Sequence, residues 1–136
     1  MPSIPRPPRR ALVTGGVSGL GLALVRALAA RGDQVMAADL AESAPAGVLP
    51  DGVEYRRLDV RSDADWAAAR DAIDRTWGGL DLLVNNAGIA AGGRIDVAEM
   101  SEWEAIVAVN LLGVVRGCRT FTPMFKRQQS GTILNI

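Results

Sequence analysis

The sequence of 136 residues is poor in the side chains that many enzymes use for catalysis. It contains no histidine, one cysteine (Cys118) and one tyrosine (Tyr55). Without histidine, the chain has no Ser-His-Asp or Cys-His nucleophile and no imidazole-ligated metal. A single cysteine excludes an internal disulfide and a thiolate metal cluster. We therefore expect no metal site, and we interpret Cys118 as a buried apolar residue.

The chain also lacks net charge and long apolar runs. Its 15 basic residues balance 15 acidic ones, so no overall field attracts nucleic acid or an anionic membrane. The longest apolar stretch of the later sequence, residues 106–115, is interrupted by Asn110 and is shorter than the roughly 20 residues of a membrane span. We expect a cytoplasmic protein with no nucleic-acid or membrane partner. An export signal is the alternative, because Arg9 and Arg10 precede an apolar run.

Short apolar runs alternate with segments of helical periodicity, which is typical of parallel strands joined by helices. Residues 1–9 are rich in Pro and Arg and are expected to form a flexible arm, whereas residues 10–136 form one domain. The segment 41–52 contains two prolines and two glycines and is expected to be a surface loop. Expected strands are 11–13, 34–38, 54–58 (at an edge), 80–84 and 131–136. Expected helices are 19–31, 63–77 capped by Ser62, and one capped by Ser101 that ends at Pro123.

A glycine-rich segment lies between the first strand and the first helix. Gly15 suits a sharp turn, Gly19 lets the backbone approach a pyrophosphate, and Gly21 allows the helix to pack closely on the strand. Free amides and the positive end of the helix dipole would then face an anion. A purely structural turn of the same composition is the alternative. The candidate binding residues of this segment are Thr14, Gly15, Ser18, Gly19, Leu20 and Gly21.

An acidic residue, Asp39, ends the second strand 18 positions after Gly21. A carboxylate near this spacing accepts hydrogen bonds from the ribose hydroxyls of an adenosine and repels a 2′-phosphate. The neighbouring candidates Ser18 and Leu40 supply no cation for that phosphate. We therefore expect NAD to be preferred over NADP. An ordinary carboxylate at a strand end is the alternative.

With these features, the sequence resembles the short-chain dehydrogenases/reductases over residues 10–136. The resemblance rests on residues 14–21 (T-G-x-x-x-G-x-G), Asp59-Val60, Asn85-Asn86-Ala87-Gly88 and Asn110, which follow the family order and spacing. It implies an α/β Rossmann-like fold with a three-layer, doubly wound parallel sheet of strand order 3-2-1-4-5, truncated after the fifth strand. It also implies the NAD(H)-binding part of an oxidoreductase that exchanges a hydride between nicotinamide and an alcohol or carbonyl.

The resemblance assigns roles to residues in the second half of the chain. Asp59 and Val60 would lie towards the adenine, while Asn86, Ala87 and Gly88 would border the cofactor. Asn110 would be the first member of an Asn-Ser-Tyr-Lys catalytic set that bends its helix and holds a water. The physical alternatives are an Asn-rich turn that satisfies its own backbone and a structural amide at position 110.

The remaining members of that catalytic set are expected after the fifth strand. The 136 residues contain no Tyr-x-x-x-Lys pair, and neither Tyr55 nor Lys126 can substitute. We therefore expect this chain to bind cofactor weakly and to be inactive alone, taking a small-molecule substrate only when completed. An exposed fifth strand predicts a homo-oligomer or aggregation. Gly113 and Gly117 either pack the long helix on a copy of itself or let it approach the sheet.

Two other functions stay open at this point. One is a non-catalytic module that binds nucleotide or oligomerises. The other, more remote, is an S-adenosylmethionine-dependent methyltransferase, which also uses a glycine turn and a strand-end acid; residues 85–88 argue against it.

Overall fold

A computed structural model describes residues 6–90 and 92–136 of the chain. Most of the arm expected at residues 1–9 lies outside the described residues. The last residue of that segment is attached to the domain: the Arg9 amide donates to Asp33 Oδ1 at 2.9 Å, and the Arg9 carbonyl accepts from the Gln34 amide at 2.8 Å. Gln34 is the first residue of the second strand, so these bonds align the start of the first strand with the start of the second.

Five strands form one sheet in the order β3-β2-β1-β4-β5, and all neighbouring pairs are parallel. The predicted strand order and the edge position of β3 are therefore confirmed. The strands are β1 (Arg10–Thr14), β2 (Gln34–Asp39), β3 (Glu54–Arg57), β4 (Leu82–Asn85) and β5 (Thr132–Asn135). The order changes direction between β1 and β4, because β2 and β3 lie on one side of β1 while β4 and β5 lie on the other.

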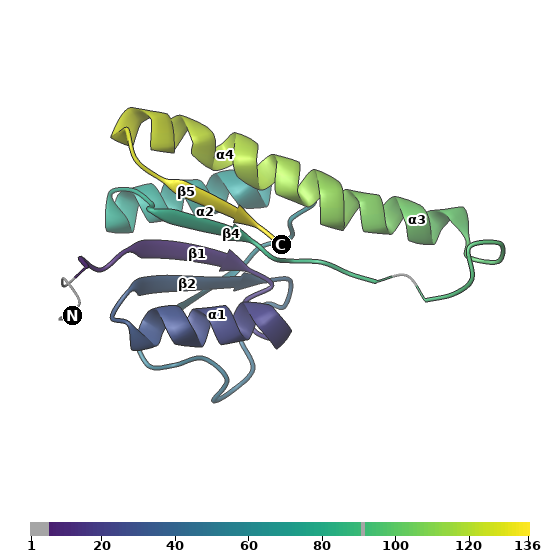
Figure 1. Cartoon of the computed structure of the whole chain (residues 1–136), viewed down its shortest axis with the longest axis horizontal. Helices are drawn as coiled ribbons and strands as arrows, with labels where there is room; N and C mark the ends of the chain where they lie inside the picture. Colours follow the sequence, from purple (N-terminus) through teal and green to yellow (C-terminus); the bar gives the residue numbers. More distant parts are fainter. Residues whose placement is uncertain (1–5, 91) are drawn as a thin grey trace, which may run out of the picture.

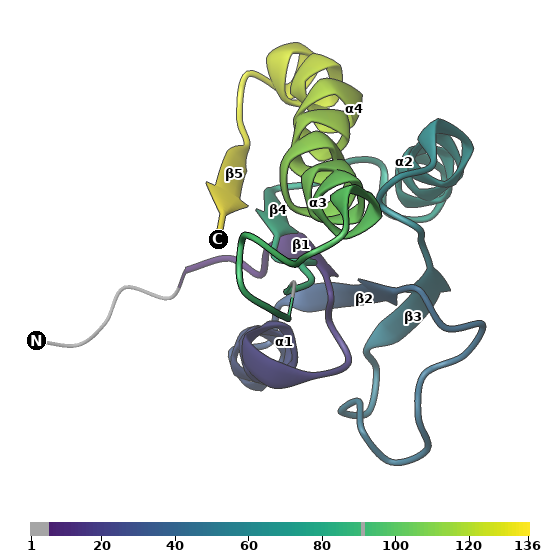
Figure 2. The same cartoon turned by 90° about the vertical axis from the view of Figure 1, so that its right-hand side faces the viewer.

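Helices cover both faces of this sheet, so the domain has three layers (Figure 1 and Figure 2). Helix α1 (Gly19–Ala30) lies on one face, and α2 (Asp63–Trp77) and α4 (Leu112–Gln128) lie on the other. Two further segments, α3 (Met100–Ile106) and a π-helical turn, η1 (Val107–Leu111), continue directly into α4. The expected loop at 41–52 contains no helix or strand.

Each face of the sheet has its own hydrophobic core. Under α1, Val25 and Leu28 pack against apolar side chains of β1, β2 and β4. On the opposite face, Trp66 of α2 meets Phe121 of α4 edge to face, with ring centroids 6.3 Å apart. The central strands read as continuous apolar runs because both of their faces are covered. At the start of α2, Ser62 accepts from the Asp65 amide at 3.1 Å, which confirms the predicted cap.

The boundaries of β4 and of the long helix differ from the predictions. Ser101 is not a cap, because α3 begins at Met100 and Ser101 already lies in its first turn. Pro123 does not end α4, which continues to Gln128 and stops at Gln129 with φ +54°. Buried Phe121 and Met124 hold the helix on the sheet on both sides of the proline. Strand β4 begins at Leu82, not at Leu80. The Leu80 amide donates to Gln128 Oε1 at 3.1 Å, and its carbonyl accepts from Gln128 Nε2 at 2.7 Å.

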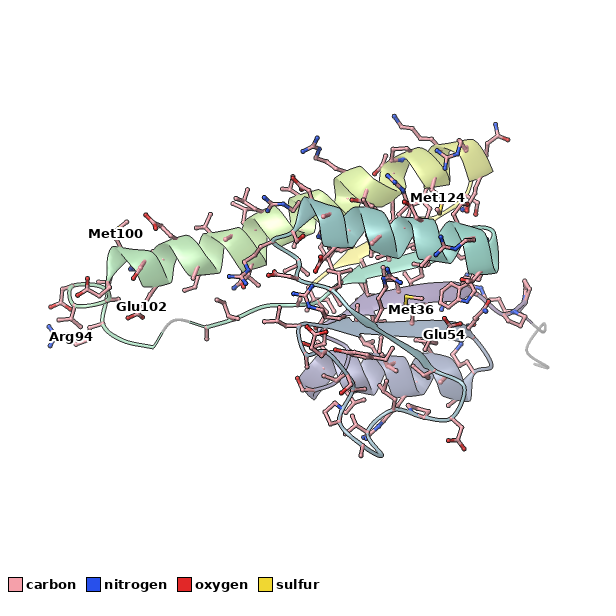
Figure 3. The ribbon with its side chains drawn as sticks, turned by 180° about the vertical axis from the view of Figure 1, so that it is seen from behind. Met36, Glu54, Arg94, Met100, Glu102 and Met124 are labelled. Carbon is pink, nitrogen blue, oxygen red and sulfur yellow. The ribbon has the colours of Figure 1, made fainter. Side chains whose placement is uncertain are left out.

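The long helix extends past the sheet. Figure 3 shows Met100 and Glu102 at the end of the long helix that lies away from the sheet, and Met124 near the opposite end of the helix. No residue of α3 is buried, and the apolar side chains of Trp103 in α3 and Val107 in η1 are 37% and 45% exposed. Cys118 is half-buried rather than buried. By length and a mean hydropathy of 1.3, Met100–Gln128 could cross a membrane, but its second half packs on β4, β5 and α2 as a core helix.

Gly113 and Gly117 face the sheet and are buried inside the chain. A β-carbon at Gly113 would lie 2.9 Å from Val60 Cγ2, and one at Gly117 would overlap the Asn85 side chain. Of the two interpretations of these glycines, the structure therefore supports close approach of the helix to its own sheet.

We predict that Gly117→Ala destabilises the fold. The added methyl group overlaps Asn85 and lies 2.9 Å from Trp66, and overpacking of this kind costs about 1–3 kcal/mol. Denaturant unfolding measures the loss. Gly92→Ala is the control, because a β-carbon at that position would have nothing within 4 Å and its φ is not positive. Equal midpoints for the two variants would contradict the packing that we describe.

Candidate cofactor site

The main candidate site is a cavity of about 330 Å³ at the carboxyl ends of the parallel strands. Ligands of open α/β sheets bind at this edge, where the strand order changes direction. Loops that follow β1, β2, β3 and β4 all contribute to its wall. The lining residues are Gly15, Ser18, Asp39, Leu40, Leu58, Asp59, Val60, Arg61, Asn86, Ala87, Gly88, Ile89 and Val109.

The glycine turn adopts the conformation that its composition predicts. Gly15 has φ +64° and Gly19 has φ +52°, values that favour glycine. A β-carbon added at Gly19 would have no other atom within 4 Å, so the backbone is accessible to a ligand at this position. Gly21 has a different contact from the one expected: a β-carbon at this position would overlap the Gly15 carbonyl. Gly21 therefore lets the helix fold back on the turn itself.

Hydrogen bonds connect the end of β1 to the end of β4. Thr14 Oγ1 donates to the Val84 carbonyl at 3.3 Å and accepts from the amides of Asn86 and Ala87 at 3.0 and 3.1 Å. In return, Asn86 Nδ2 donates to the carbonyls of Thr14 and Gly15 at 3.0 and 3.3 Å. Thr14 is buried and does not line the cavity. Its role in the structure is to hold the glycine turn and the loop after β4 beside each other.

Asp39 ends β2 with its carboxylate at the cavity. One oxygen accepts from the Leu40 amide at 2.8 Å, and the other accepts a longer bond from the Val17 amide at 3.4 Å. These bonds orient the carboxylate but leave acceptor positions on both oxygens, since a carboxylate has about four. The geometry suits recognition of a diol.

Asp59 is held by a cation that sequence reasoning missed. Arg61 Nε and Nη2 donate to the two Asp59 oxygens at 2.9 and 2.8 Å, and the Arg61 amide donates to Oδ1 at 2.9 Å. These bonds, led by that of the guanidinium, lower the pKa of Asp59 below its ordinary value despite partial desolvation. The bond to Asp59 also raises the pKa of Arg61. An arginine two positions after the acid was the signal available in the sequence.

Asn110 lies in the π-helical turn η1 rather than in a regular helix. Its Oδ1 accepts from the Ile89 amide at 2.8 Å, and its Nδ2 donates to the Ile89 carbonyl at 2.8 Å. The side chain is exposed and does not line the cavity, but Ile89 does. Asn110 therefore attaches the long helix to the loop that follows Gly88, and π-helical turns of this kind occur often at functional sites.

The structure brings together nine of the thirteen predicted cofactor residues around one cavity: Gly15, Ser18, Asp39, Leu40, Asp59, Val60, Asn86, Ala87 and Gly88. Thr14, Gly19, Leu20 and Gly21 belong to the same turn but do not line the cavity, and Leu20 is exposed. The lining residues that sequence reasoning missed are Leu58, Arg61, Ile89 and Val109. Among residues 6–90 and 92–136, no group of acidic or cysteine side chains could hold a metal ion.

Comparison with known proteins agrees with this arrangement. The model of the short chain dehydrogenase family matches residues 9–136. The chain belongs to the short-chain dehydrogenase family. This family consists of oxidoreductases that bind a nicotinamide cofactor. The match therefore excludes the methyltransferase alternative.

Relatives within the short-chain dehydrogenases include two steroid enzymes. The chain is 42% identical over 129 residues to a 3-alpha-(or 20-beta)-hydroxysteroid dehydrogenase of Mycobacterium tuberculosis, and 36% identical over 129 residues to a 3-beta-hydroxysteroid dehydrogenase of Comamonas testosteroni. Both matches cover 93% of this chain and 50% of the relative. A short-chain dehydrogenase structure from Streptomyces avermitilis matches with a TM-score of 0.87 at 28% identity, covering 96% of this chain and 49% of that one. The chain thus spans about half the length of the relatives it matches.

We predict that Arg61→Gln raises the pKa of Asp59 towards its ordinary value of about 4. Because the native pKa of Asp59 is depressed, this pair stabilises the fold above the ordinary pKa, and the contribution is lost as the pH falls through the native value. A carboxyl ¹³C NMR titration of Asp59 measures the shift. Arg94→Gln, which breaks an exposed pair with Asp96, should leave the Asp59 titration unchanged. An unaltered Asp59 titration in Arg61→Gln would refute the assignment.

Proposed function

We propose that this chain is the cofactor-binding part of a short-chain dehydrogenase and that it binds NAD(H) in preference to NADP(H). The observation that carries the proposal is the Asp39 carboxylate, which lies on the same cavity as the Gly15 turn. A dinucleotide needs both elements, because amides bind the pyrophosphate and a carboxylate binds the adenosine ribose.

The charges around Asp39 support rejection of a 2′-phosphate. Ser18 and Leu40, its neighbours in the cavity wall, carry no charge. Arg61 lines the same cavity, but its guanidinium is engaged by Asp59. Arg57, the parallel-strand partner of Asp39, is engaged by Glu42 and Asp65. A phosphate near Asp39 would therefore meet a carboxylate, with both nearby cations already paired.

The residues at the two ends of the cavity would hold different parts of the dinucleotide. Asp59 and Val60 would border the adenine, and Asn86, Ala87 and Gly88 would border the rest of the cofactor towards the nicotinamide. When bound, the nicotinamide supplies hydride chemistry. Asn110, whose amide holds the loop after Gly88, would keep this wall in place and take part in a proton path. In a protein of full family length, the reaction would be exchange of a hydride with a small-molecule alcohol or carbonyl.

The chain by itself is proposed to bind cofactor without turnover, because its 136 residues hold no Tyr-x-x-x-Lys pair. A phenol with an ordinary pKa near 10 acts as an acid or base at neutral pH only beside a positive charge. We further propose a cytoplasmic protein without a nucleic-acid or membrane partner, in keeping with its lack of net charge.

We predict that Asp39→Ala weakens NAD binding by about 1–3 kcal/mol, because two ribose hydroxyls lose a charged acceptor. The same change should narrow the gap between NAD and NADP, since the repelling carboxylate is removed. Isothermal titration calorimetry with both dinucleotides measures the two effects. Asp51→Ala removes a carboxylate from an exposed turn and serves as the control. Unchanged NAD affinity in Asp39→Ala would disprove the ribose contact.

We also propose that the chain associates with itself through β5. Among residues 6–90 and 92–136, this strand pairs only with β4, and Leu134 and Ile136 are 43% and 58% exposed. An apolar strand with free backbone groups pairs readily with another chain.

Light scattering at tens of micromolar should therefore detect species larger than a monomer, and Leu134→Lys should reduce them, because a charge on an edge strand opposes pairing. Val97→Lys adds the same charge on an exposed loop residue distant in sequence from β5 and should have no effect. A clean monomer of the unmodified chain would count against this association.

A further inference from the structure

The last residue of β3, Arg57, makes two ion pairs that the proposed cofactor contacts do not use. Its Nε lies 3.3 Å from Glu42 Oε1, and its Nη1 donates to Asp65 Oδ2 at 2.7 Å. Glu42 belongs to the segment that follows Asp39, whereas Asp65 lies in the first turn of α2. One guanidinium therefore bridges two segments that are 23 residues apart in sequence.

Both partners of this Arg57 bridge, Glu42 and Asp65, lie next to residues of the cavity wall. Asp65 Oδ2, which accepts from Arg57, also accepts from the Asp59 amide at 2.8 Å. On the other side, Glu42 lies two residues beyond Leu40. Tyr55 of β3 donates its hydroxyl to the Ala41 carbonyl between them. The bridge thus connects the loop that carries Asp39 and Leu40 to the loop that carries Asp59 and Val60, and all four of these residues line the cavity.

Arg57 itself does not line the cavity, and both of its carboxylate partners are beside it. Its charge is therefore directed at the protein rather than at a ligand. The two loops have no regular secondary structure between Leu40 and Val53 or between Leu58 and Ser62. Loops that a ligand must order on binding reduce its affinity, whereas loops held in place beforehand do not.

We propose that Arg57 is a positioning residue that sets the spacing between the two loops at the adenosine end of the cavity. The proposal rests on the proposed function for its ligand, and the loop ordering can be measured without any ligand. Removal of the bridge should loosen both loops at the same time and weaken the binding of NAD as well as that of NADP, because both dinucleotides contain the adenosine that the two loops border in the proposed site.

Arg57→Ala tests this, with Arg70→Ala as a matched control. Arg70 makes an ion pair of the same 2.7 Å length with Asp71, and its side chain is 42% exposed against 40% for Arg57, but it lies in the middle of α2 and does not line the cavity. In calorimetry, Arg57→Ala should raise the Kd for NAD, NADP and ADP-ribose by about two- to fivefold, the range expected for an exposed ion pair. Arg70→Ala should leave all three unchanged.

Two further measurements separate positioning from a general loss of stability. Glu42→Ala should weaken NAD less than Arg57→Ala, because the bond to Asp65 remains, and should add little in the Arg57→Ala background. Amide hydrogen exchange of the ligand-free chain should accelerate at residues 40–42 and 59–61 together in Arg57→Ala, with no such change in Arg70→Ala.

These experiments test the proposed NAD binding and the positioning role of Arg57 separately. If the unmodified chain fails to bind NAD, the proposed function is wrong, and hydrogen exchange still decides whether Arg57 connects the loops. Unchanged exchange in Arg57→Ala overturns the positioning role. A loss confined to NADP, with unchanged affinity for NAD and ADP-ribose, also overturns it, because Arg57 would then act on the 2′-phosphate alone and not on the loops.

Discussion

The structure depends on the hydrogen bonds that join the ends of β1 and β4. These strands are neighbours in the sheet but are separated by some 70 residues of chain, and the sheet reverses its order between them. Thr14 Oγ1 and the Asn86 amide group satisfy the backbone of both strand ends without any contribution from a ligand. These bonds fix the glycine turn against the loop after β4, and both segments line the cavity. Nearly all other features of the site are arranged around this junction.

The cavity wall formed by the loops after β2 and β3 combines charged side chains with the apolar side chains of Leu40, Leu58 and Val60. Asp39 and Asp59 supply the acidic groups, and the nearby arginines are each engaged by carboxylates of the chain. Such pairs contribute little to the stability of an exposed surface. Their effect is geometric: they join two loops that lack regular secondary structure.

The long helix divides into a half that belongs to the core and a half that does not. From Gly113 onwards it lies on the sheet, since glycines at 113 and 117 permit a close approach and Phe121 enters the core. Before that point, the helix extends past the sheet and exposes Val107 and Leu111. Asn110 lies where the two halves meet, and the π-helical turn provides the extra backbone length there. The irregular turn, the amide and the loop after Gly88 form one structural unit.

Much of the fold could be predicted from the sequence because its signals are local. Apolar runs covered on both faces, a Ser62 cap and a glycine turn each depend on residues within a few positions of one another. The errors arose where a distant contact overrode a local preference. Leu80, predicted to lie in the fourth strand, is hydrogen-bonded to the Gln128 side chain instead. Helix α4 continues past Pro123, a residue type that usually ends a helix, because side chains on both sides of it pack in the core.

The sequence by itself determined the order of strands and helices, the glycine-rich turn and the position of the acid that ends β2, since backbone conformation and side-chain spacing encode these features directly. Only the tertiary structure decided that Arg57 pairs with Glu42 and Asp65, that Asn110 holds Ile89, and that Gly113 and Gly117 face inward. Those pairings join segments whose register is set by sheet packing, and a side chain's partner across such a distance follows from geometry that no short stretch of sequence contains.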